Sequence, residues 1–245
     1  MADIPEKAVD RQARAGERAD SCLLAFVAGY VDTCVFVALF GLFTAHVTGN
    51  FVLIGAELVH HEGDVLPKLL ALPVFILAVA LTVKAVDALR RAGRAPVAPL
   101  LHAEAVLLIA CAGVALALGT PSSASAPSAL VPGILATVAM GLQNGLMRLE
   151  LSALPATTVM TINVTQSAID VTTMLSGRAD PGAGPRRAEA KRRFARMWPP
   201  ILAFTAGAAA GAAGYTLAGL AALALPALLC VVLGLRLSRR ILGHA

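Results

Sequence analysis

Long apolar runs alternate with short charged segments over most of the chain. A run of about 20 helical residues, at 1.5 Å per residue, covers a hydrocarbon core of about 30 Å. We predict membrane spans over residues 22–43, 66–86, 99–119, 131–149, 198–215 and 219–237. The last two lie within Trp198–Leu235, a stretch of 38 residues without a charge. As one helix it would extend about 57 Å, so we predict a turn between Gly214 and Gly219.

Two further segments are too polar to cross lipid easily, although each has apolar sequence on both sides. They cover about residues 43–60 and about residues 156–175. Their hydroxyl and amide side chains, with a glycine that frees the backbone, are Thr48, Gly49 and Asn50 in the first segment and Thr161 and Asn163 in the second. Irregular backbone at membrane depth persists only where protein or a water-filled cavity satisfies its polar groups. We therefore predict two broken helices that line a cavity.

The basic clusters decide between two topologies. If both broken segments crossed the membrane fully, the basic loop over residues 87–98 would lie outside. If each segment enters and leaves on one side, six spans remain and every basic cluster lies inside, as the positive-inside rule requires. The resulting topology has a cytoplasmic N-terminal tail (1–21), an external loop (120–129), a basic cytoplasmic loop (177–197) and a cytoplasmic C-terminus (238–245).

Six pairs of like residues recur in the same order in the two halves, at offsets of 112 or 113 residues. They are Gly29/Gly141, Asp32/Asn144, Thr44/Thr157, Thr48/Thr161, Asn50/Asn163 and Glu57/Asp170. With three spans in each half, the second copy lies upside down relative to the first, as in many secondary transporters. We predict an all-α polytopic membrane protein with six transmembrane helices plus two re-entrant, broken helices in an inverted repeat. The repeats are residues 22–119 and 130–237.

Composition agrees with a membrane location and argues against several classes of function. Hydrophobic residues make up 58% of the 245 residues and charged residues 14%, well outside ordinary soluble composition. The net charge of +5 comes from Lys and Arg between apolar runs, so we expect no nucleic-acid partner. The four cysteines have no metal-ligand or redox spacing, and no phosphate-loop, zinc-hydrolase or serine-hydrolase motif is found. We therefore predict no enzymatic activity, no cofactor and no metal.

Several segments resemble one known family. They are Ala28–Asp32, Gly41–Phe43, His46–Asn50 and Gly141–Asn144, and they resemble the YoaK-like family of bacterial membrane proteins, a domain of unknown function. The likeness covers about residues 22–237. It implies a multi-pass protein of the bacterial inner membrane and supplies no established substrate or reaction.

Asp32 is the sharpest candidate for a site residue. A carboxylate near the middle of a span costs roughly 2.5–3.5 kcal/mol on insertion scales and is a functional candidate by default. We interpret Asp32 as a site for a proton or cation. The alternative is an acid that is protonated, or tied to a neighbouring hydroxyl for packing.

Side chains of the broken segments and of the matched span complete the predicted substrate or ion site. They are Thr48, Gly49, Asn50, Asn144, Thr161 and Asn163. Hydroxyl and amide oxygens, free carbonyls and a helix terminus can coordinate an ion or a solute. The alternative is a structural cap, because Thr and Asn satisfy free backbone groups at any helix end.

Five further residues are secondary candidates, and four of them have simple structural alternatives. They are Gly29, His46, Glu57, Arg148 and Asp170. The matched acids Glu57 and Asp170 would otherwise be solvated at the interface. Arg148 either snorkels to the cytoplasmic surface or holds an anionic group. His46 either relays protons near neutral pH or lies at a loop mouth.

These residues favour a secondary transporter or permease. It would move an unidentified small solute, coupled to a proton or cation, with the broken segments at the central site and the lipid bilayer as surroundings. The alternative is a non-transporting membrane protein that binds lipid or a partner protein.

Overall fold

The computed structural model describes residues 6–60, 64–176 and 183–242, and every element in these ranges is helical. The elements are α1 (Glu6–Ala38), α2 (Gly49–His60), α3 (Leu66–Arg91), α4 (Val97–Leu118), α5 (Pro127–Leu149), α6 (Met160–Leu175), α7 (Ala183–Ala218), the 3-10 helix η1 (Gly219–Leu223) and α8 (Ala224–Leu242). The all-helical prediction is confirmed.

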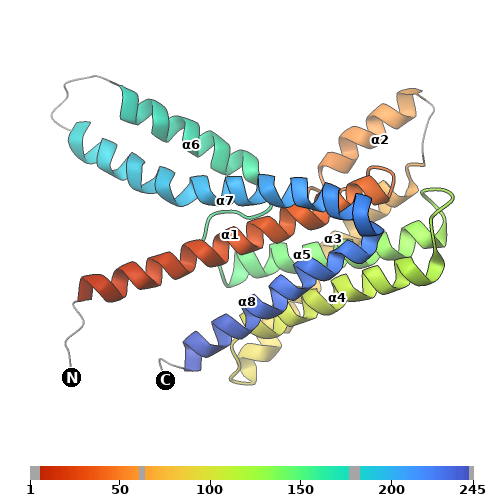
Figure 1. Ribbon diagram of the computed structural model, residues 1–245, viewed down its shortest axis with the longest axis horizontal. Coiled ribbons are helices and arrows are strands. Elements are labelled where there is room, and N and C mark those ends of the chain that lie inside the picture. The colour runs from red at the N-terminus through yellow and green to blue at the C-terminus, as the bar shows by residue number, and fades with distance from the viewer. Residues whose placement is uncertain (1–5, 61–63, 177–182, 243–245) are drawn as a thin grey trace.

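Five segments of the described chain are long and apolar enough to cross a membrane, judged by length and composition. They are Gly16–Ala38, Leu66–Arg91, Val97–Leu118, Pro127–Leu149 and Gly184–Arg239. The fifth contains both α7 and α8, between which the chain turns back at η1 (Figure 1). The turn begins at Gly219, whose φ of +58° suits glycine, at the C-terminal limit of the predicted range.

The long helices run roughly along one axis, and the start of α1 and the end of α8 lie toward one end of the bundle (Figure 1). The same end holds the α3–α4 connection and the N-terminal part of α7, whereas the α4–α5 connection and η1 lie toward the other end. The two short helices begin beside the middle of the bundle. From there α2 runs toward the η1 end and α6 runs toward the end that holds the start of α1.

The first break begins earlier than the sequence indicated. Helix α1 ends at Ala38, and Phe40 (φ +54°) and Gly41 (φ +77°) adopt the left-handed backbone conformation. The N–H of Gly41 donates to the carbonyl of Phe36, a bond typical of a glycine C-cap. Gly49 therefore does not break the helix: it is the first residue of α2.

The second break shows the same displacement. Helix α5 ends at Leu149, the connection covers residues 150–159, and α6 begins at Met160. Thr161 and Asn163 therefore lie in the first turn of α6 and not in irregular backbone. In both halves, the predicted break is the start of the short helix that follows the connection.

The predicted tail and the predicted basic loop are largely helical. Helix α1 begins at Glu6, and α7 begins at Ala183 and continues without interruption into its apolar part. Both segments are rich in Ala, Glu, Lys and Arg, which are strong helix formers, so the helix continues beyond the apolar residues. Residues 1–5 of the tail and 177–182 of the loop lie outside the described residues.

Helices α1 and α7 pack backbone against backbone. A Cβ atom added at Gly207 would overlap the carbonyl oxygen of Phe26, and one added at Gly211 would overlap the carbonyl oxygen of Tyr30. The small residues over 207–211 thus allow the two helices to approach closely. Helix α5 packs on α3 in a similar way, because a Cβ at Gly141 would lie 2.7 Å from the Cβ of Ala78. The first long helix of each half of the chain thus packs against a helix of the other half: α1 against α7, and α5 against α3.

We expect Gly211→Ala to destabilise the protein, because the added methyl would force α1 and α7 apart at Tyr30. Overpacking of this kind costs roughly 1–3 kcal/mol. Gly113→Ala in α4 is the matched control, since no atom lies within 4 Å of its added Cβ, and alanine there should be neutral or stabilising by up to about 1 kcal/mol. Thermal unfolding of both variants in one detergent measures the difference. Equal unfolding temperatures would contradict the packing argument.

Candidate functional site

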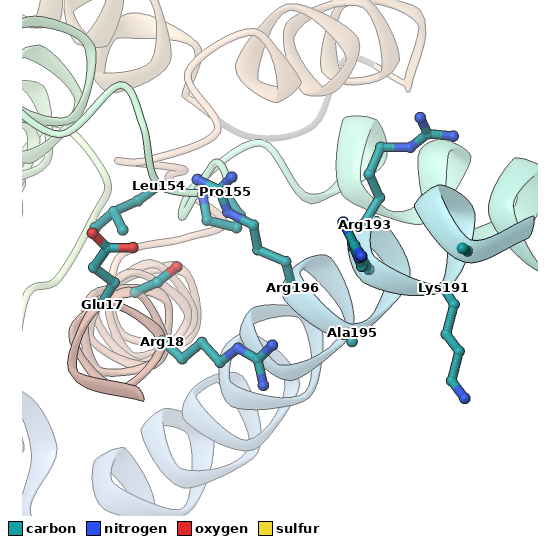
Figure 2. A pocket seen from close by; sticks show the side chains of 11 residues that line it. Glu17, Arg18, Leu154, Pro155, Lys191, Arg193, Ala195 and Arg196 are labelled. Carbon is teal, nitrogen blue, oxygen red and sulfur yellow. The ribbon is translucent and has the colours of Figure 1, made fainter. Parts of the chain in front are cut away.

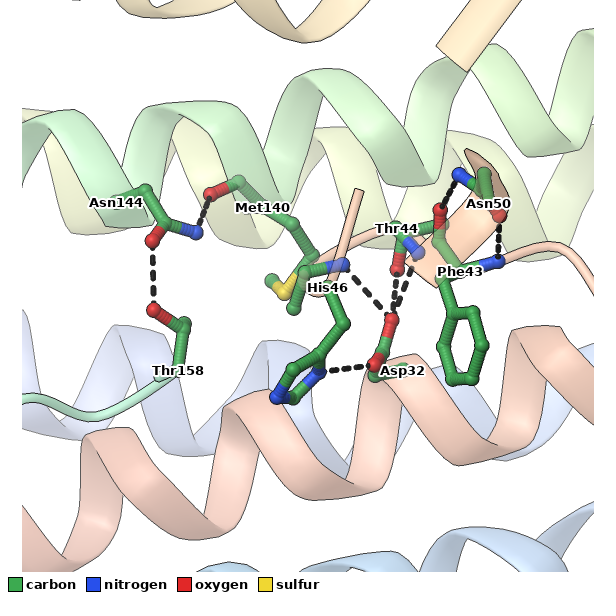
Figure 3. Close-up of polar contacts among 9 residues, drawn as sticks. Asp32, Phe43, Thr44, His46, Asn50, Met140, Asn144 and Thr158 are labelled. Atoms are coloured by element: carbon green, nitrogen blue, oxygen red, sulfur yellow. Dashed lines mark hydrogen bonds and ion pairs between the residues drawn. The ribbon is translucent and has the colours of Figure 1, made fainter. Parts of the chain in front are cut away.

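Asp32 is buried in α1, and its carboxylate binds the connection between α1 and α2 (Figure 3). Its Oδ1 accepts hydrogen bonds from the N–H groups of Thr44 (2.7 Å) and Ala45 (2.8 Å) and from the hydroxyl of Thr44 (3.1 Å). Asp32 therefore fixes the broken segment to the middle of α1.

His46 contacts the other oxygen of the same carboxylate. Its Nδ1 lies 2.7 Å from Asp32 Oδ2, and its ring lies edge-on to Phe204 of α7, with centroids 5.5 Å apart. His46 lies between α1 and α2, outside the five candidate spans. The hydrogen bond with Asp32 raises the pKa of His46, although partial burial opposes the shift. When its imidazole is protonated, His46 forms an ion pair with Asp32.

Asn50 and Asn163 make the same contact in the two halves. The Nδ2 of Asn50 donates to the carbonyl of Phe43 (2.9 Å), and its Oδ1 accepts the N–H of Phe43 (3.0 Å). The Nδ2 of Asn163 donates to the carbonyl of Ala156 (2.7 Å), also seven residues earlier. Both asparagines are only 1% exposed. Each ties the connection to the first turn of its short helix.

Asn144 takes the place of Asp32 in the second half and makes a simpler contact (Figure 3). Its Oδ1 accepts the hydroxyl of Thr158 (2.6 Å), and its Nδ2 donates to the carbonyl of Met140 in the same helix (2.9 Å). Among the described residues, no direct hydrogen bond joins Asn144 to Asp32. The structure therefore forms two separate polar groups, one at each connection.

The matched acids Glu57 and Asp170 each pair with a base on the next long helix. Glu57 lies 2.7 Å from Nζ of Lys68 in α3, and Asp170 lies 2.7 Å from the guanidinium of Arg193 in α7. Lys68 is 2% exposed and also donates to the carbonyl of Phe40 in the first break (2.9 Å). The acids are paired and not simply solvated. Removing one partner would leave a buried charge uncompensated.

A protein-family model described as a protein of unknown function, DUF1275, matches residues 21–235. The chain belongs to the DUF1275 family. No curated protein and no solved structure matches it. The match agrees with the resemblance to a family of unknown function, and the narrower YoaK-like name stays an expectation.

The remaining predicted site residues of this DUF1275 chain lie outside the two polar groups. Thr48 and Thr161 are exposed at the short helices, and Arg148 is exposed near the end of α5. Gly49 packs against the ring of Phe43, and Gly29 packs against the backbone of α7. These glycines allow close contacts. The structure brings together Asp32 and His46, but it does not join them to the two threonines or to Arg148.

Sequence reasoning did not single out three charged residues of this DUF1275 chain. Lys68 and Arg193 are the partners of the matched acids, and Glu104 lies fully buried in α4. The carboxyl group of Glu104 faces the thiol of Cys230 in α8. Lys68 and Glu104 fall inside predicted spans. A charge within a membrane span was therefore the signal that could have identified both.

We expect His46→Gln to remove a pH-dependent part of the stability of this DUF1275 protein. Because the pKa of His46 is raised in the folded state, its ion pair with Asp32 stabilises fully below the ordinary histidine pKa of about 6.5. The stabilisation is lost as pH rises through the raised value. Wild-type protein should therefore lose thermal stability as pH rises above about 6.5 and through the raised pKa of His46, and the variant should lose less.

His60→Gln is the matched control, because His60 is exposed at the end of α2. Thermal unfolding across this pH range measures all three proteins. If wild type and His46→Gln have the same pH profile, the ion pair with Asp32 does not contribute as argued.

Proposed function

We propose that this DUF1275 chain is a secondary transporter built from two inverted halves, α1–α4 and α5–α8. The observation that carries the proposal is a set of contacts that recurs in both halves. In each, an asparagine of the short helix donates to the carbonyl seven residues earlier, at 2.9 and 2.7 Å. In each, an acid of the short helix pairs with a base on the next long helix at 2.7 Å. Discontinuous helices in inverted repeats are the sites of many secondary transporters.

The direction of the short helices supports the inversion. Helices α2 and α6 begin beside the middle of the bundle and run to opposite ends (Figure 1). The exchange of first helices, α1 on α7 and α5 on α3, is the arrangement that a two-fold axis in the membrane plane would produce. We infer six spans (α1, α3, α4, α5, α7 and α8) with α2 and α6 as re-entrant helices.

The distribution of basic residues supports one orientation. Basic residues lie at the end of α3, in the N-terminal part of α7 and at the end of α8. All three segments lie toward the end of the bundle that holds the start of α1 (Figure 1). We place this end in the cytoplasm of a bacterium and the α4–α5 connection outside the inner membrane.

In this proposal, Asp32 and His46 couple transport to protons. Protonated His46 and Asp32 hold the first connection on α1, and loss of the proton removes the ion pair and loosens α2. The exposed apolar side chains of α2, among them Val52 and Val59, leave this helix lightly packed and able to move. Asn50 and Asn163 would meet the solute between the connections. We propose no catalytic step.

The alternative is a non-transporting membrane protein that binds lipid or a partner protein. The observation that favours it is a basic cavity between α1 and α7. Solute uptake distinguishes the two, because a protein that only binds lipid would move no solute.

The topology predicts which connections share a side of the membrane. We expect Ala92→Cys and Gly184→Cys to be labelled from the cytoplasmic side and Ser122→Cys from the opposite side. All three positions are exposed, and the native cysteines would first be replaced. Labelling of oriented vesicles with a membrane-impermeant maleimide measures the sidedness. Opposite sidedness of residues 92 and 184 would contradict the inverted repeat and the transport mechanism built on it.

The transport proposal predicts solute uptake that depends on Asp32. Purified wild-type protein in liposomes, with a pH gradient, should accumulate at least one member of a panel of amino acids, sugars, nucleobases and organic acids. Asp32→Asn should reduce that uptake at least about tenfold, because hydrogen bonds to a charged group are worth roughly 1.5–3 kcal/mol.

Asp87→Asn is the matched control, because Asp87 is exposed on α3 and has no ion pair among the described residues. Thermal unfolding shows whether Asp32→Asn is folded. If wild-type protein takes up no solute of the panel, the lipid- or partner-binding alternative is favoured and the transport proposal fails.

A further inference from the structure

A cavity of about 610 Å³ lies between residues 17–21 of α1, the α5–α6 connection and the N-terminal part of α7 (Figure 2). Its volume is in the range of about 300–1,000 Å³ that holds small ligands. Helix α1 supplies Glu17, Arg18 and Ser21, and the connection supplies Leu154 and Pro155. The cavity shares no residue with the polar groups around Asp32 and Asn144.

The charged lining of the cavity is mostly basic. Its cations are Arg18, Lys191, Arg192, Arg193 and Arg196, and its one acid is Glu17. The guanidinium of Arg193 is occupied by Asp170 (2.7 Å) and Glu189 (2.8 Å). The other four cations have no ion pair among the described residues. The lining therefore retains an excess of positive charge.

Two of these cations are placed to bind a ligand. Figure 2 shows the side chains of Arg18 and Arg196 in the space between α1 and α7, whereas Lys191 extends away from it. Both arginines are exposed, so their side chains are not buried by packing and remain accessible to a ligand. A guanidinium presents a planar fork of donors that matches the oxygens of a phosphate group.

Ser21 gives an independent indication of a ligand. Its side chain lines the cavity and is only 1% exposed, and its hydroxyl has no hydrogen-bond partner within the described part of the chain. A buried hydroxyl without a partner is unfavourable. An anion in the cavity would supply the missing acceptor.

The cavity lies at one margin of the candidate spans. Its α1 residues stand at the start of the span Gly16–Ala38. Trp198, just beyond the cavity in α7, is 44% exposed and stacks on Phe194 with ring centroids 5.7 Å apart. Exposed tryptophan is typical of the level of lipid headgroups, where basic pockets between helices bind anionic headgroups.

We propose that this cavity binds a phosphate-bearing anion, held by the guanidinium groups of Arg18 and Arg196 and by the hydroxyl of Ser21. Phosphate oxygens accept hydrogen bonds, which suits a lining that offers donors. Glu17 is the acceptor through which a hydroxyl group on the ligand, such as that of a glycerol headgroup, would bind. The phosphate belongs either to a lipid headgroup or to a soluble molecule. This proposal does not rest on transport.

The experiment uses the full chain and two probes. In nanodiscs of phosphatidylcholine with a minority of phosphatidylglycerol, native mass spectrometry of the released protein counts retained phosphatidylglycerol. In detergent, titration with inorganic phosphate measures the shift in thermal unfolding. We expect wild-type protein to bind at least one probe, and Arg18→Gln/Arg196→Gln to bind it at least about tenfold more weakly, since hydrogen bonds to charged groups are worth roughly 1.5–3 kcal/mol.

The matched control is Arg91→Gln/Arg94→Gln, which removes the same charge at exposed arginines that do not line the cavity. This variant should bind like wild type. Ser21→Ala should weaken binding without lowering the thermal stability of the ligand-free protein, because its hydroxyl has no partner there.

The outcomes separate the two sources of phosphate. Retention of phosphatidylglycerol without a phosphate shift supports a lipid headgroup, and a phosphate shift without lipid retention supports a soluble ligand. The proposal is overturned if wild-type protein binds neither probe. It is also overturned if both double variants weaken binding equally, because general surface charge would then explain it.

Discussion

The backbone N–H groups of Thr44 and Ala45 donate hydrogen bonds to Asp32. These bonds satisfy a requirement of any interrupted helix in apolar surroundings, which is that its freed backbone groups find hydrogen-bond partners. Between Ala38 and Gly49 the chain gives up its regular helical bonds, and the freed backbone groups need partners because lipid offers none. The carboxylate of Asp32 accepts two of the N–H groups. The ammonium of Lys68 donates to the carbonyl of Phe40. One anion and one cation from the neighbouring long helices therefore make the first break possible.

The second connection meets the same constraint with neutral groups. Asn144 accepts a hydroxyl from Thr158, and Asn163 donates to the carbonyl of Ala156. Only the first connection has a carboxylate and a histidine in contact. A pH response is therefore expected at the first connection and not at the second, because only the first contains the contact between Asp32 and His46. The two connections therefore differ in the charge of the side chains that hold them.

Residue type and spacing were sufficient to predict the matched pairs. The amide nitrogens of Asn50 and Asn163 each donate to the carbonyl seven residues earlier, and Asn50 also accepts the N–H of Phe43. The helix ends were not predictable in the same way. Phe40 is not a residue type that signals a left-handed conformation, so α1 ends earlier than its apolar composition indicates. The basic segment before Trp198 is polar but helix-forming, and polarity alone suggested a loop.

The partners of the acids were also beyond sequence reasoning, for a different reason. Glu57 and Lys68 lie on different helices, and so do Asp170 and Arg193. Their contact depends on the relative register of packed helices, which a single sequence does not specify. Averaging hydropathy over a span hides a single charge, as it did for Lys68 and Glu104. The residues most informative about the interior were therefore the exceptions within apolar runs.

The contact of α1 with α7 has a consequence for biosynthesis. During synthesis, α1 enters the membrane long before residues 204–211 of α7 have been made. The face of α1 around Gly29 therefore lacks its packing partner until α7 is inserted. Asp32 obtains its hydrogen-bond partners early, because Thr44, Ala45 and His46 follow it within 14 residues. The nascent chain can shield its carboxylate locally while the helix surface stays open. Assembly of the two halves is then completed only when α7 has been inserted.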